Sequence, residues 1–346
     1  MDEAIEGVFR GQGVRFETSG TTGGGRVVEL SPAALLASAR AVNAHLEATE
    51  GDVWVRAIPV DHVGGFGILL RAELSGSRVV EMAEKWNIRG FVDLVAREGG
   101  TLISLVPTQV FDLVKGGVES PGTVRAVVVG GGELEAGLCA AARELGWPVL
   151  RSYGMTEAGS QIATEELGGG RMRLLGDWEV RVGERGVAEI RGSALFAGYV
   201  DAVSGATVDA RGEEGWFRTS DRVELGEDES GVYVQGVRRE GRVVKVLGEL
   251  VDLDVIERAV GSGVVVGVAD KRAGMRVVLV VEEDGIDVGG YNLRVRGPAR
   301  ISEVVRVEAI PRGELGKPRY AALVDLIGLG GETGGGGGGL KFPELL

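Results

Sequence analysis

Residues 127–133, VVVGGGE, form an all-apolar run that passes directly into glycines. Two further strand-like runs end in glycine or polar clusters, IPVDHVGG at 58–65 and LRSYGMTE at 150–157. Between Asp52 and Gly154 such runs alternate with amphipathic stretches, which is typical of βαβ units on a parallel sheet. Runs that are apolar throughout indicate strands covered on both faces. Because ligands of open α/β sheets bind beyond the carboxyl ends of the strands, we expect the three loops to line one binding edge.

The character of the sequence changes after Thr164 and again near Arg238. Residues 165–238 are short alternating pieces punctuated by Gly and Asp, which predicts a small antiparallel β-barrel or meander. Residues 239–327 combine a helix expected over 247–260 with strands such as VVVGVAD, which predicts a separate α+β domain. We therefore predict an α/β protein with a large N-terminal domain over 1–238, its sheet region ending at about 164, a small C-terminal domain over 239–327 and a Gly-rich tail over 328–346.

The amino-acid composition argues against several classes of protein. The 346 residues, 44% of them hydrophobic, supply enough core for two domains, and the 60 glycines lack a collagen period and so predict turns and ligand-facing loops. The net charge of −13 argues against a general nucleic-acid or anionic-membrane surface. One cysteine, Cys139, and two histidines argue against a disulfide framework and a thiolate zinc site. With no signal-peptide pattern and no apolar run of about 18–20 residues, we expect a cytoplasmic protein without membrane insertion.

The stretch ETSGTTGGGR at 17–26 follows a strand-like VRF and concentrates hydroxyls and glycines. Its N–H and O–H groups can wrap phosphate oxygens, with Arg26 as the cation, although the GK[ST] of a Walker A loop is missing. The alternative is an ordinary Ser/Thr/Gly turn. The stretch resembles the TSGTTGxPK loop of the adenylate-forming superfamily, with Gly25 and Arg26 in place of Pro and Lys. This resemblance implies ATP binding by Thr18, Ser19, Gly20, Thr21, Thr22 and Arg26.

Further motifs of the same superfamily follow in order. The resemblance implies that the turn of Gly130, Gly131 and Gly132 approaches adenine, where a missing Cβ admits a flat base. In YGMTE it implies that Tyr153 stacks on adenine, Thr156 holds a phosphate and Glu157 helps to bind Mg²⁺, a cation that favours carboxylates and substrate phosphates. GWFRTSD at 215–221 resembles GWxxTGD, which implies that Asp221 accepts both ribose hydroxyls.

The predicted C-terminal domain begins with RREGRVVKVLGE at 238–249, which resembles the hinge motif of the superfamily. The resemblance implies a mobile domain, a ribose contact from Arg239 and a place near the CoA thiol tunnel for Gly248, while the usual hinge acid is replaced by Gly241. PRGELGKPR at 311–319 resembles the loop whose lysine, here Lys317, supports adenylation as a compact counter-charge; the alternative is a surface lysine in a turn. Arg238, Arg239, Arg242 and Lys245 are expected to form a basic island for anionic ATP and CoA.

A narrower resemblance is to the o-succinylbenzoate–CoA ligases of menaquinone biosynthesis. It is carried by IPVDHVGG at 58–65, SLVPTQ at 104–109, and YGMTE with SQIAT at 160–164. It implies that His62 lines the acyl pocket and that Ser160 and Gln161 lie beside an aromatic acid. A packed loop histidine is the alternative for His62. Cys139 is expected to be a core residue.

The resemblance implies a two-step reaction in which a carboxylate and ATP give an acyl-adenylate, and CoA then displaces AMP after the C-terminal domain rotates. One alternative is an adenylating ligase for another acid or for a carrier-protein acceptor. The other is a degenerate nucleotide-binding module, suggested by the altered hinge and by the 17 residues before Thr18, where the superfamily carries an N-terminal subdomain. One side of the usual core could be shortened for the same reason, or a partner chain could cover it. A homo-oligomer therefore stays an open alternative.

Overall fold

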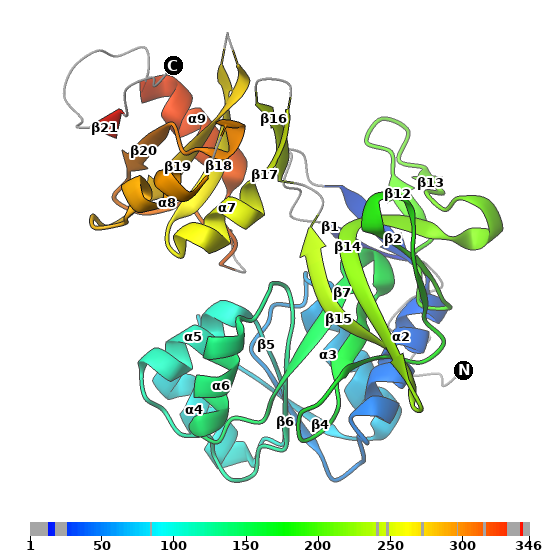
Figure 1. Cartoon of the computed structure of the whole chain (residues 1–346). Coiled ribbons are helices and arrows are strands. Elements are labelled where there is room, and N and C mark those ends of the chain that lie inside the picture. The colour runs from blue at the N-terminus through cyan, green and yellow to red at the C-terminus, as the bar shows by residue number, and fades with distance from the viewer. Residues whose placement is uncertain are drawn as a thin grey trace. The chain divides into compact units, whose positions relative to one another are not determined.

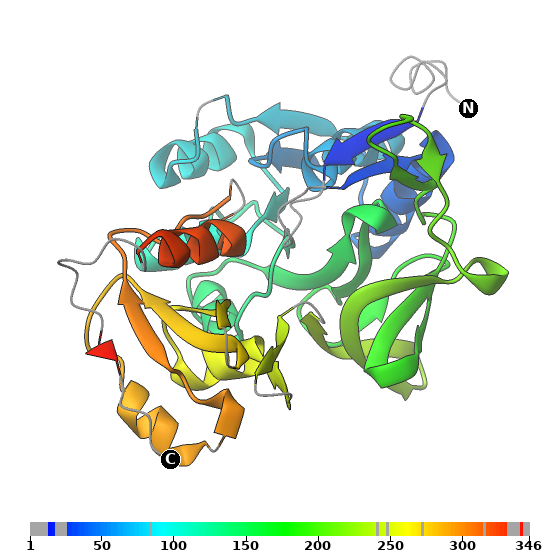
Figure 2. The same cartoon turned by 90° about the horizontal axis from the view of Figure 1, so that it is seen from above.

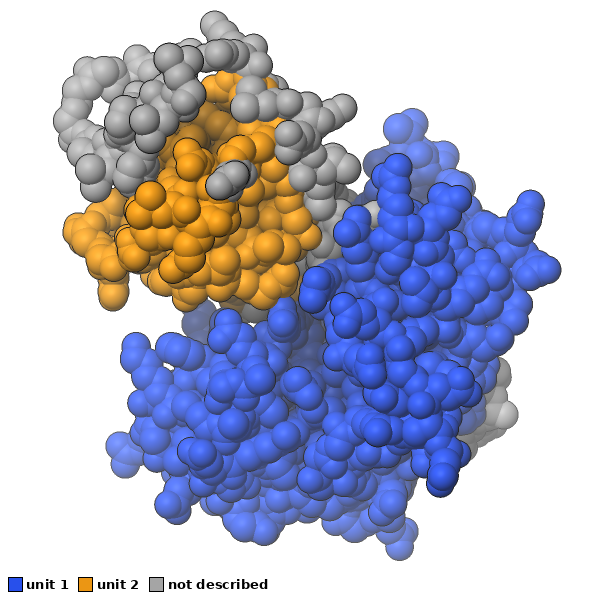
Figure 3. All heavy atoms as spheres, viewed as in Figure 1, with its two compact units in different colours: residues 1–19, 25–238 blue, residues 20–24, 239–346 orange. Residues whose placement is uncertain are grey.

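The computed structural model describes residues 13–17, 26–83, 85–239, 242–246, 249–270, 273–295, 297–313, 316–330 and 340–341. The chain forms two compact units, residues 1–19 with 25–238 and residues 20–24 with 239–346, which Figure 3 colours separately. The assignment of these units as an adenylation domain and a mobile C-terminal domain stays a prediction. Within the described ranges, no helix has the length and apolar character needed to cross a bilayer.

Unit 1 is built on parallel strands in the order β4 (Arg78–Glu81), β3 (Val53–Arg56), β5 (Leu102–Leu105), β6 (Ala126–Val129) and β7 (Val149–Met155). In the sequence these strands alternate with α3 (Val63–Ser75), α4 (Ile88–Glu98), α5 (Pro107–Lys115) and α6 (Ala136–Glu144), and α2 (Pro32–His45) precedes β3. Figure 1 shows α4, α5 and α6 together on one side of the strands and α2 and α3 on the other. The predicted α/β class with a parallel sheet is confirmed.

The two faces of this sheet carry separate cores. Along β6, Ala126 and Val128 pack in the core that includes α2 and α3, whereas Val127 and Val129 pack in the core that includes α4, α5 and α6. Successive strand residues point to opposite faces, so a strand with helices on both sides is apolar along nearly its whole length. Cys139 is 3% exposed in the second core, as expected for a core residue.

The β-rich region continues this sheet through β8 (Ser160–Glu165), β9 (Met172–Leu174), β15 (Gly231–Arg239), β14 (Phe217–Asp228), β11 (Val187–Arg191) and β10 (Glu179–Val182). It is thus an antiparallel extension of the parallel strands and not a separate barrel; because β9 pairs with β15 and β11 with β14, it is not a meander of consecutive strands either. A second sheet joins β1 (Val14–Glu17), β2 (Val27–Leu30), β12 (Gly198–Val200) and β13 (Thr207–Val208). Short 3₁₀ turns lie at Thr156–Ala158 (η1), Glu184–Gly186 (η2) and Glu213–Gly215 (η3).

Unit 2 is a sheet with helices on both faces. Its described strands are β16 (Val243–Val246), β17 (Glu249–Asp252), β18 (Val264–Asp270), β19 (Gly274–Val281), β20 (Glu303–Arg306) and β21 (Leu340–Lys341). Its helices are α7 (Leu253–Val260), α8 (Val288–Arg294) and α9 (Tyr320–Gly330), with a 3₁₀ turn η4 at Gly297–Ala299. Ile256 of α7 and Tyr291 of α8 share one core, while Leu323 and Ile327 of α9 share another. In Figure 2 the red α9 lies along one side of the orange and yellow strands.

Two elements of unit 2 differ from the sequence prediction. The helix expected over 247–260 begins only at Leu253, because Asp252 caps it by accepting from the N–H groups of Asp254 and Val255 at 3.0 and 3.3 Å. Residues 249–252 instead pair with β16. Within the stretch predicted as a tail, α9 extends to Gly330 and Leu340–Lys341 pair with β20.

Candidate active site

The YGMTE motif lies where β7 ends and the chain turns through η1 into the antiparallel strand β8. Gly154 faces β8 so closely that a Cβ on it would lie 1.8 Å from the carbonyl oxygen of Ser160. Only glycine fits there, because no backbone shift could absorb that overlap cheaply. The motif therefore marks a strand end followed by a tight return through η1 into β8.

Tyr153 and Asp221 come together although 68 residues separate them. The Tyr153 hydroxyl donates to Oδ2 of Asp221 at 3.3 Å, and the tyrosine is 6% exposed. Asp221 belongs to β14, where its N–H donates to Oγ1 of the buried Thr219 at 3.0 Å. The residues expected to contact adenine and ribose thus share one region of unit 1, as one nucleoside would require.

Glu157 is held in a second cluster with Tyr199 and Arg26. The Tyr199 hydroxyl donates to Oε1 of Glu157 at 2.8 Å, and the Arg26 guanidinium lies over the Tyr199 ring, 4.9 Å from its centroid. Burial, with the neighbouring Glu157 carboxylate, raises the pKa of Tyr199 to about 12, so its proton stays in place at neutral pH. Arg26, predicted at the end of the phosphate loop, therefore lies near the carboxylate predicted to bind Mg²⁺.

One carboxylate is a partial set of ligands for a divalent cation. Among the described residues there is no group of three or more His, Cys, Asp or Glu side chains that could hold a metal ion alone. Mg²⁺ usually keeps several waters and is bound by one or two carboxylates together with substrate phosphates. Glu157 fits that role for a magnesium ion that arrives with a nucleotide.

The loops after β3, β5 and β6 follow the carboxyl ends of neighbouring strands. His62 precedes α3, and its carbonyl accepts from the N–H of Gly65 and of Phe66, both at 3.0 Å. Gln109 joins two of these loops, because it accepts from the Val106 N–H at 3.0 Å and donates to the Ala57 carbonyl at 3.1 Å. The glycine turn follows β6 directly; Gly131 has φ +77°, and a Cβ on Gly130 would lie 3.2 Å from Ser152 Oγ.

Ser160 and Gln161 have different partners. Ser160 Oγ accepts from Nη2 of Arg71 at 2.8 Å. The Gln161 side chain is buried, and its Oε1 accepts from the Thr164 hydroxyl at 2.5 Å. The structure thus turns Ser160 toward a charged group, whereas Gln161 is occupied within β8.

Arg71, on α3, is the functional candidate that the sequence analysis missed. It is 1% exposed, its guanidinium lies 5.6 Å from the centroid of the Trp54 ring, and its Nε is buried without a hydrogen-bond partner. Among the described residues no carboxylate pairs with it, and burial alone lowers its pKa to about 10. A buried cation with spare donors and no counter-charge is costly, and an anionic ligand would remove that cost.

One feature of the sequence could have indicated that Arg71 is buried, namely Gly67, which lies one helical turn before it. A Cβ on Gly67 would lie 3.1 Å from Arg71 Nη2, so the glycine leaves room for the guanidinium beside its own helix. Residues four apart share a helix face, and Ile68, three before Arg71, is fully buried. Because Arg71 shares a helix face with Gly67 and Ile68, it was a candidate for burial.

In unit 2, Lys317 lies in a tight loop between β20 and α9. The Gly313 N–H donates to the Lys317 carbonyl at 2.8 Å, the Arg319 N–H donates to the Pro311 carbonyl at 2.8 Å, and Gly316 has φ +73°. Arg312 and Pro318 form a β-bridge across the loop. The predicted lysine thus lies in a short loop whose two arms are joined by backbone hydrogen bonds. Its role stays a prediction.

The prediction of a basic island is wrong for Arg242. Arg242 has a side chain 11% exposed, donates to both oxygens of Glu257 at 3.0 and 2.7 Å, and lies 2.9 Å from Asp254. It also donates to the Tyr320 hydroxyl at 3.1 Å. Because two carboxylates already neutralise it, Arg242 is a structural residue and adds no charge for ATP or CoA.

Several predicted site residues lie outside the described part of the chain. These are the phosphate-loop residues Thr18, Ser19, Gly20, Thr21 and Thr22, the hinge residue Gly241 and the tunnel residue Gly248. Their assigned roles stay predictions.

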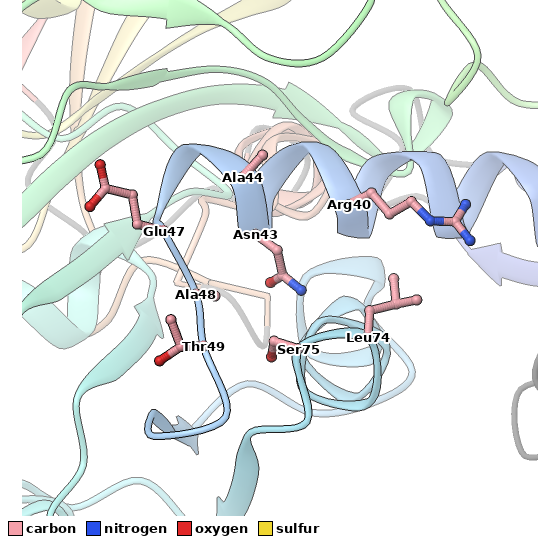
Figure 4. Close-up of a pocket in the computed structure, with 8 residues that line it drawn as sticks. All are labelled: Arg40, Asn43, Ala44, Glu47, Ala48, Thr49, Leu74 and Ser75. Atoms are coloured by element: carbon pink, nitrogen blue, oxygen red, sulfur yellow. The ribbon is translucent and has the colours of Figure 1, made fainter.

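A hollow of about 420 Å³ lies between the ends of α2 and α3 (Figure 4). It is lined by Arg40, Asn43, Ala44, Glu47, Ala48, Thr49, Leu74 and Ser75. Asn43 Nδ2 and the Ser75 hydroxyl both donate to the Arg71 carbonyl, at 2.7 and 2.9 Å, which fixes the backbone of this helical turn. The hollow contains none of the predicted site residues that the structure describes.

Comparison with known proteins decides the family. The model of the AMP-binding enzyme family matches residues 18–200. The chain belongs to the AMP-binding enzyme family. This confirms the resemblance drawn from the sequence motifs, and the matched region holds the described cluster of Glu157, Tyr199 and Arg26.

Individual members of the family are similar over most of the chain. A probable 2-succinylbenzoate–CoA ligase of Mycobacterium tuberculosis (strain CDC 1551 / Oshkosh) is 31% identical over 332 residues, covering 89% of this chain and 82% of that protein. The o-succinylbenzoate CoA synthetase of Bacillus subtilis in complex with the acyl-adenylate intermediate has a TM-score of 0.74 at 25% identity, covering 89% of this chain and 68% of that one. The same enzyme with ATP and magnesium ion has a TM-score of 0.73 at 25% identity, covering 89% and 69%.

Proposed function

We propose that the chain is an AMP-forming 2-succinylbenzoate–CoA ligase that acts in menaquinone biosynthesis. The observation that carries the proposal is Arg71, a buried guanidinium that has no carboxylate partner among the described residues and that touches Ser160, a residue expected beside the acyl substrate. 2-Succinylbenzoate has two carboxylates, so one can react while the other pairs with a fixed cation. The similarity to enzymes named for this acid supports the same substrate.

In the first step a carboxylate oxygen attacks the α-phosphorus of ATP, the bond to the bridging oxygen breaks, and pyrophosphate leaves. Tyr153 and Asp221 receive the adenosine, while Glu157 takes a ligand position on the Mg²⁺ that accompanies the phosphates. Lys317 balances the negative charge that grows on the phosphoryl oxygens. In the second step the CoA sulfur attacks the acyl carbon, AMP leaves, and the thiol proton passes to solvent. The chain supplies positions and charge and no covalent nucleophile.

The buried Cys139 is the one cysteine of the chain, and burial raises the pKa of its thiol. A thiol in this form does not compete with CoA for the acyl-adenylate, because the thiolate is the nucleophile. It also fits the cytoplasm, the compartment that we propose, where thiols stay reduced.

The test is pyrophosphate release from 2-succinylbenzoate, ATP and Mg²⁺, with and without CoA. We expect release with the wild type and a fall of about 10²–10³-fold in Lys317→Ala, as for other groups that stabilise transition-state charge. Lys115→Ala is the matched control, because Lys115 is an exposed lysine at the end of α5 that lies against the Phe111 ring. Release that the Lys317 change leaves intact contradicts the mechanism.

The same assay separates the alternatives. Release with other acids but not with 2-succinylbenzoate would make the chain a ligase for a different acid. Acyl transfer to a phosphopantetheinyl carrier but not to CoA would change the acceptor. ATP binding without release by any acid would favour a nucleotide-binding module.

A further inference from the structure

Ser38 is a buried hydroxyl in the middle of α2 whose bonds leave its own helix. It is 2% exposed, and its Oγ lies 3.0 Å from the carbonyl oxygen of Gly159 and 3.4 Å from Oγ of Ser160. These partners lie more than 120 residues away along the chain, in the turn between η1 and β8. The hydroxyl therefore joins α2 to the turn that carries Ser160.

The hydrogen atoms in this cluster can be arranged in one order. A serine hydroxyl has one hydrogen, and the Gly159 carbonyl can only accept, so Ser38 donates to Gly159. In its contact with Ser160, Ser38 must then accept. Ser160 in turn donates its hydrogen to Ser38 and accepts from Nη2 of Arg71 at 2.8 Å. The chain of donors runs from Arg71 through Ser160 and Ser38 to Gly159, and bonds in such a chain strengthen one another.

The turn that receives this chain has a backbone that needs support. Ser160 has φ +141° and Gly159 has φ +61°. A residue with a side chain in such a region costs about 1–3 kcal/mol and persists only where its surroundings hold it. The bond from Ser38 holds the peptide between these two residues. Ser38 thus fixes both the backbone of Ser160 and the direction of its hydroxyl.

We propose that Ser38 is a positioning residue that sets the selectivity for acids with a second carboxylate by aiming Arg71 through Ser160. The inference rests on the proposed function, because it needs a diacid substrate. With Ser160 oriented, one Nη2 hydrogen of Arg71 is used and the guanidinium is held in one place. Its Nε, buried and without a partner, is left for the ligand.

The experiment measures kcat/KM for pyrophosphate release with 2-succinylbenzoate and with a monoacid analogue that lacks the second carboxylate. For Ser38→Ala we expect the ratio of the two values to fall about 5–10-fold, the equivalent of one hydrogen bond, with the monoacid value changed less than about twofold. Ser160→Ala should lower the ratio by a similar factor. The double variant should lower it no further, because both changes break the same chain.

Ser31→Ala is the matched control. Ser31 caps the same helix by accepting from the Ala34 N–H at 3.1 Å, and within the described part of the chain it makes no hydrogen bond to the 159–160 turn. We expect it to lower the thermal midpoint and leave the ratio unchanged.

Two results overturn the inference in different ways. If the wild type prefers the diacid and Ser38→Ala keeps that preference, or lowers both activities equally, Ser38 is a packing residue and the proposed function still stands. If the wild type treats both acids alike, the diacid substrate itself is wrong, and the inference falls with it.

Discussion

Arg125 and Arg71 are two arginines of unit 1 with opposite surroundings. Arg125 lies at the amino ends of β3, β5 and β6, where Nε and Nη2 each donate to an oxygen of the buried Asp52 at 2.8 Å. Thr101 adds a bond to the same carboxylate at 2.7 Å. Arg71 is more deeply buried and has Ser160 as its side-chain hydrogen-bond partner among the described residues.

The pKa values follow these surroundings. The hydrogen bond to Asp52 raises the pKa of Arg125, whereas burial lowers that of Arg71 to about 10. Arg125 is fully paired and stabilises the fold. Arg71 has no carboxylate partner among the described residues, so we expect it to weaken the ligand-free fold and propose that a bound anion offsets that cost. The difference separates an arginine of the scaffold from an arginine of a site.

The largest expected effect is on the scaffold arginine. Arg125→Met leaves Asp52 buried without its cation, so we expect the free energy of unfolding to fall by about 3–5 kcal/mol. Urea unfolding measures it. Arg78→Met is the control, because Arg78 is half exposed in its pair with Glu98 and such pairs contribute less than about 1 kcal/mol. Equal losses in the two variants would contradict the assignment of Arg125.

The same cluster predicts a dependence on acid pH. Burial alone would raise the pKa of Asp52, but bonds from Arg125, the Thr49 N–H and Thr101 outweigh it and lower the pKa to about 2. Because the folded pKa lies below the unfolded one, this stability is present above about pH 4 and is lost as the pH falls through 2.

We expect Asp52 to contribute about 2 kcal/mol in this way. Asp52→Asn should lack that part of the pH dependence, which unfolding curves at pH 5, 3 and 2 would show as a narrowing gap to the wild type. A gap that stays constant across these pH values would argue against the lowered pKa.

The smallest expected change in the free energy of unfolding is an increase, opposite to the loss expected for Arg125→Met. Arg71→Met removes a buried charge that has no counter-charge within the described part of the chain and keeps an apolar chain of similar length, so we expect the ligand-free protein to gain roughly 1–2 kcal/mol. Urea unfolding of the two proteins without substrate measures the gain. A loss like that of Arg125→Met would mean that Arg71 belongs to the scaffold.

Local patterns allowed much of the fold to be predicted. β6 is apolar at every position, and β3 and β5 are apolar at every position but Arg56 and Ser104, because helices cover both faces of the sheet; this requirement is visible in the sequence. The return at Gly154 and the proximity of Tyr153 to Asp221 agree with motifs recognised one at a time. In contrast, the join between the parallel strands and the β-rich region depends on strand order, which a local pattern does not show.

The charges of the site were harder to predict, because charge alone does not reveal burial or pairing. Arg242 and Arg71 look alike in the sequence, yet Arg242 meets Glu257 and Asp254 while Arg71 meets no acid in the described part of the chain. Ser38 has no motif around it, and its partners come from more than 120 residues away. These contacts exist only once the chain is folded.

We propose above that Arg71 receives the second carboxylate of the acid. Its most direct test is the ratio of kcat/KM for 2-succinylbenzoate to that for a monoacid analogue, compared between the wild type and Arg71→Met. A buried charge pair broken on one side costs several kcal/mol, so we expect the wild type to prefer the diacid by about 10²–10³-fold and the variant to lose that preference while still releasing pyrophosphate from the monoacid. A variant that keeps the preference would contradict the claim.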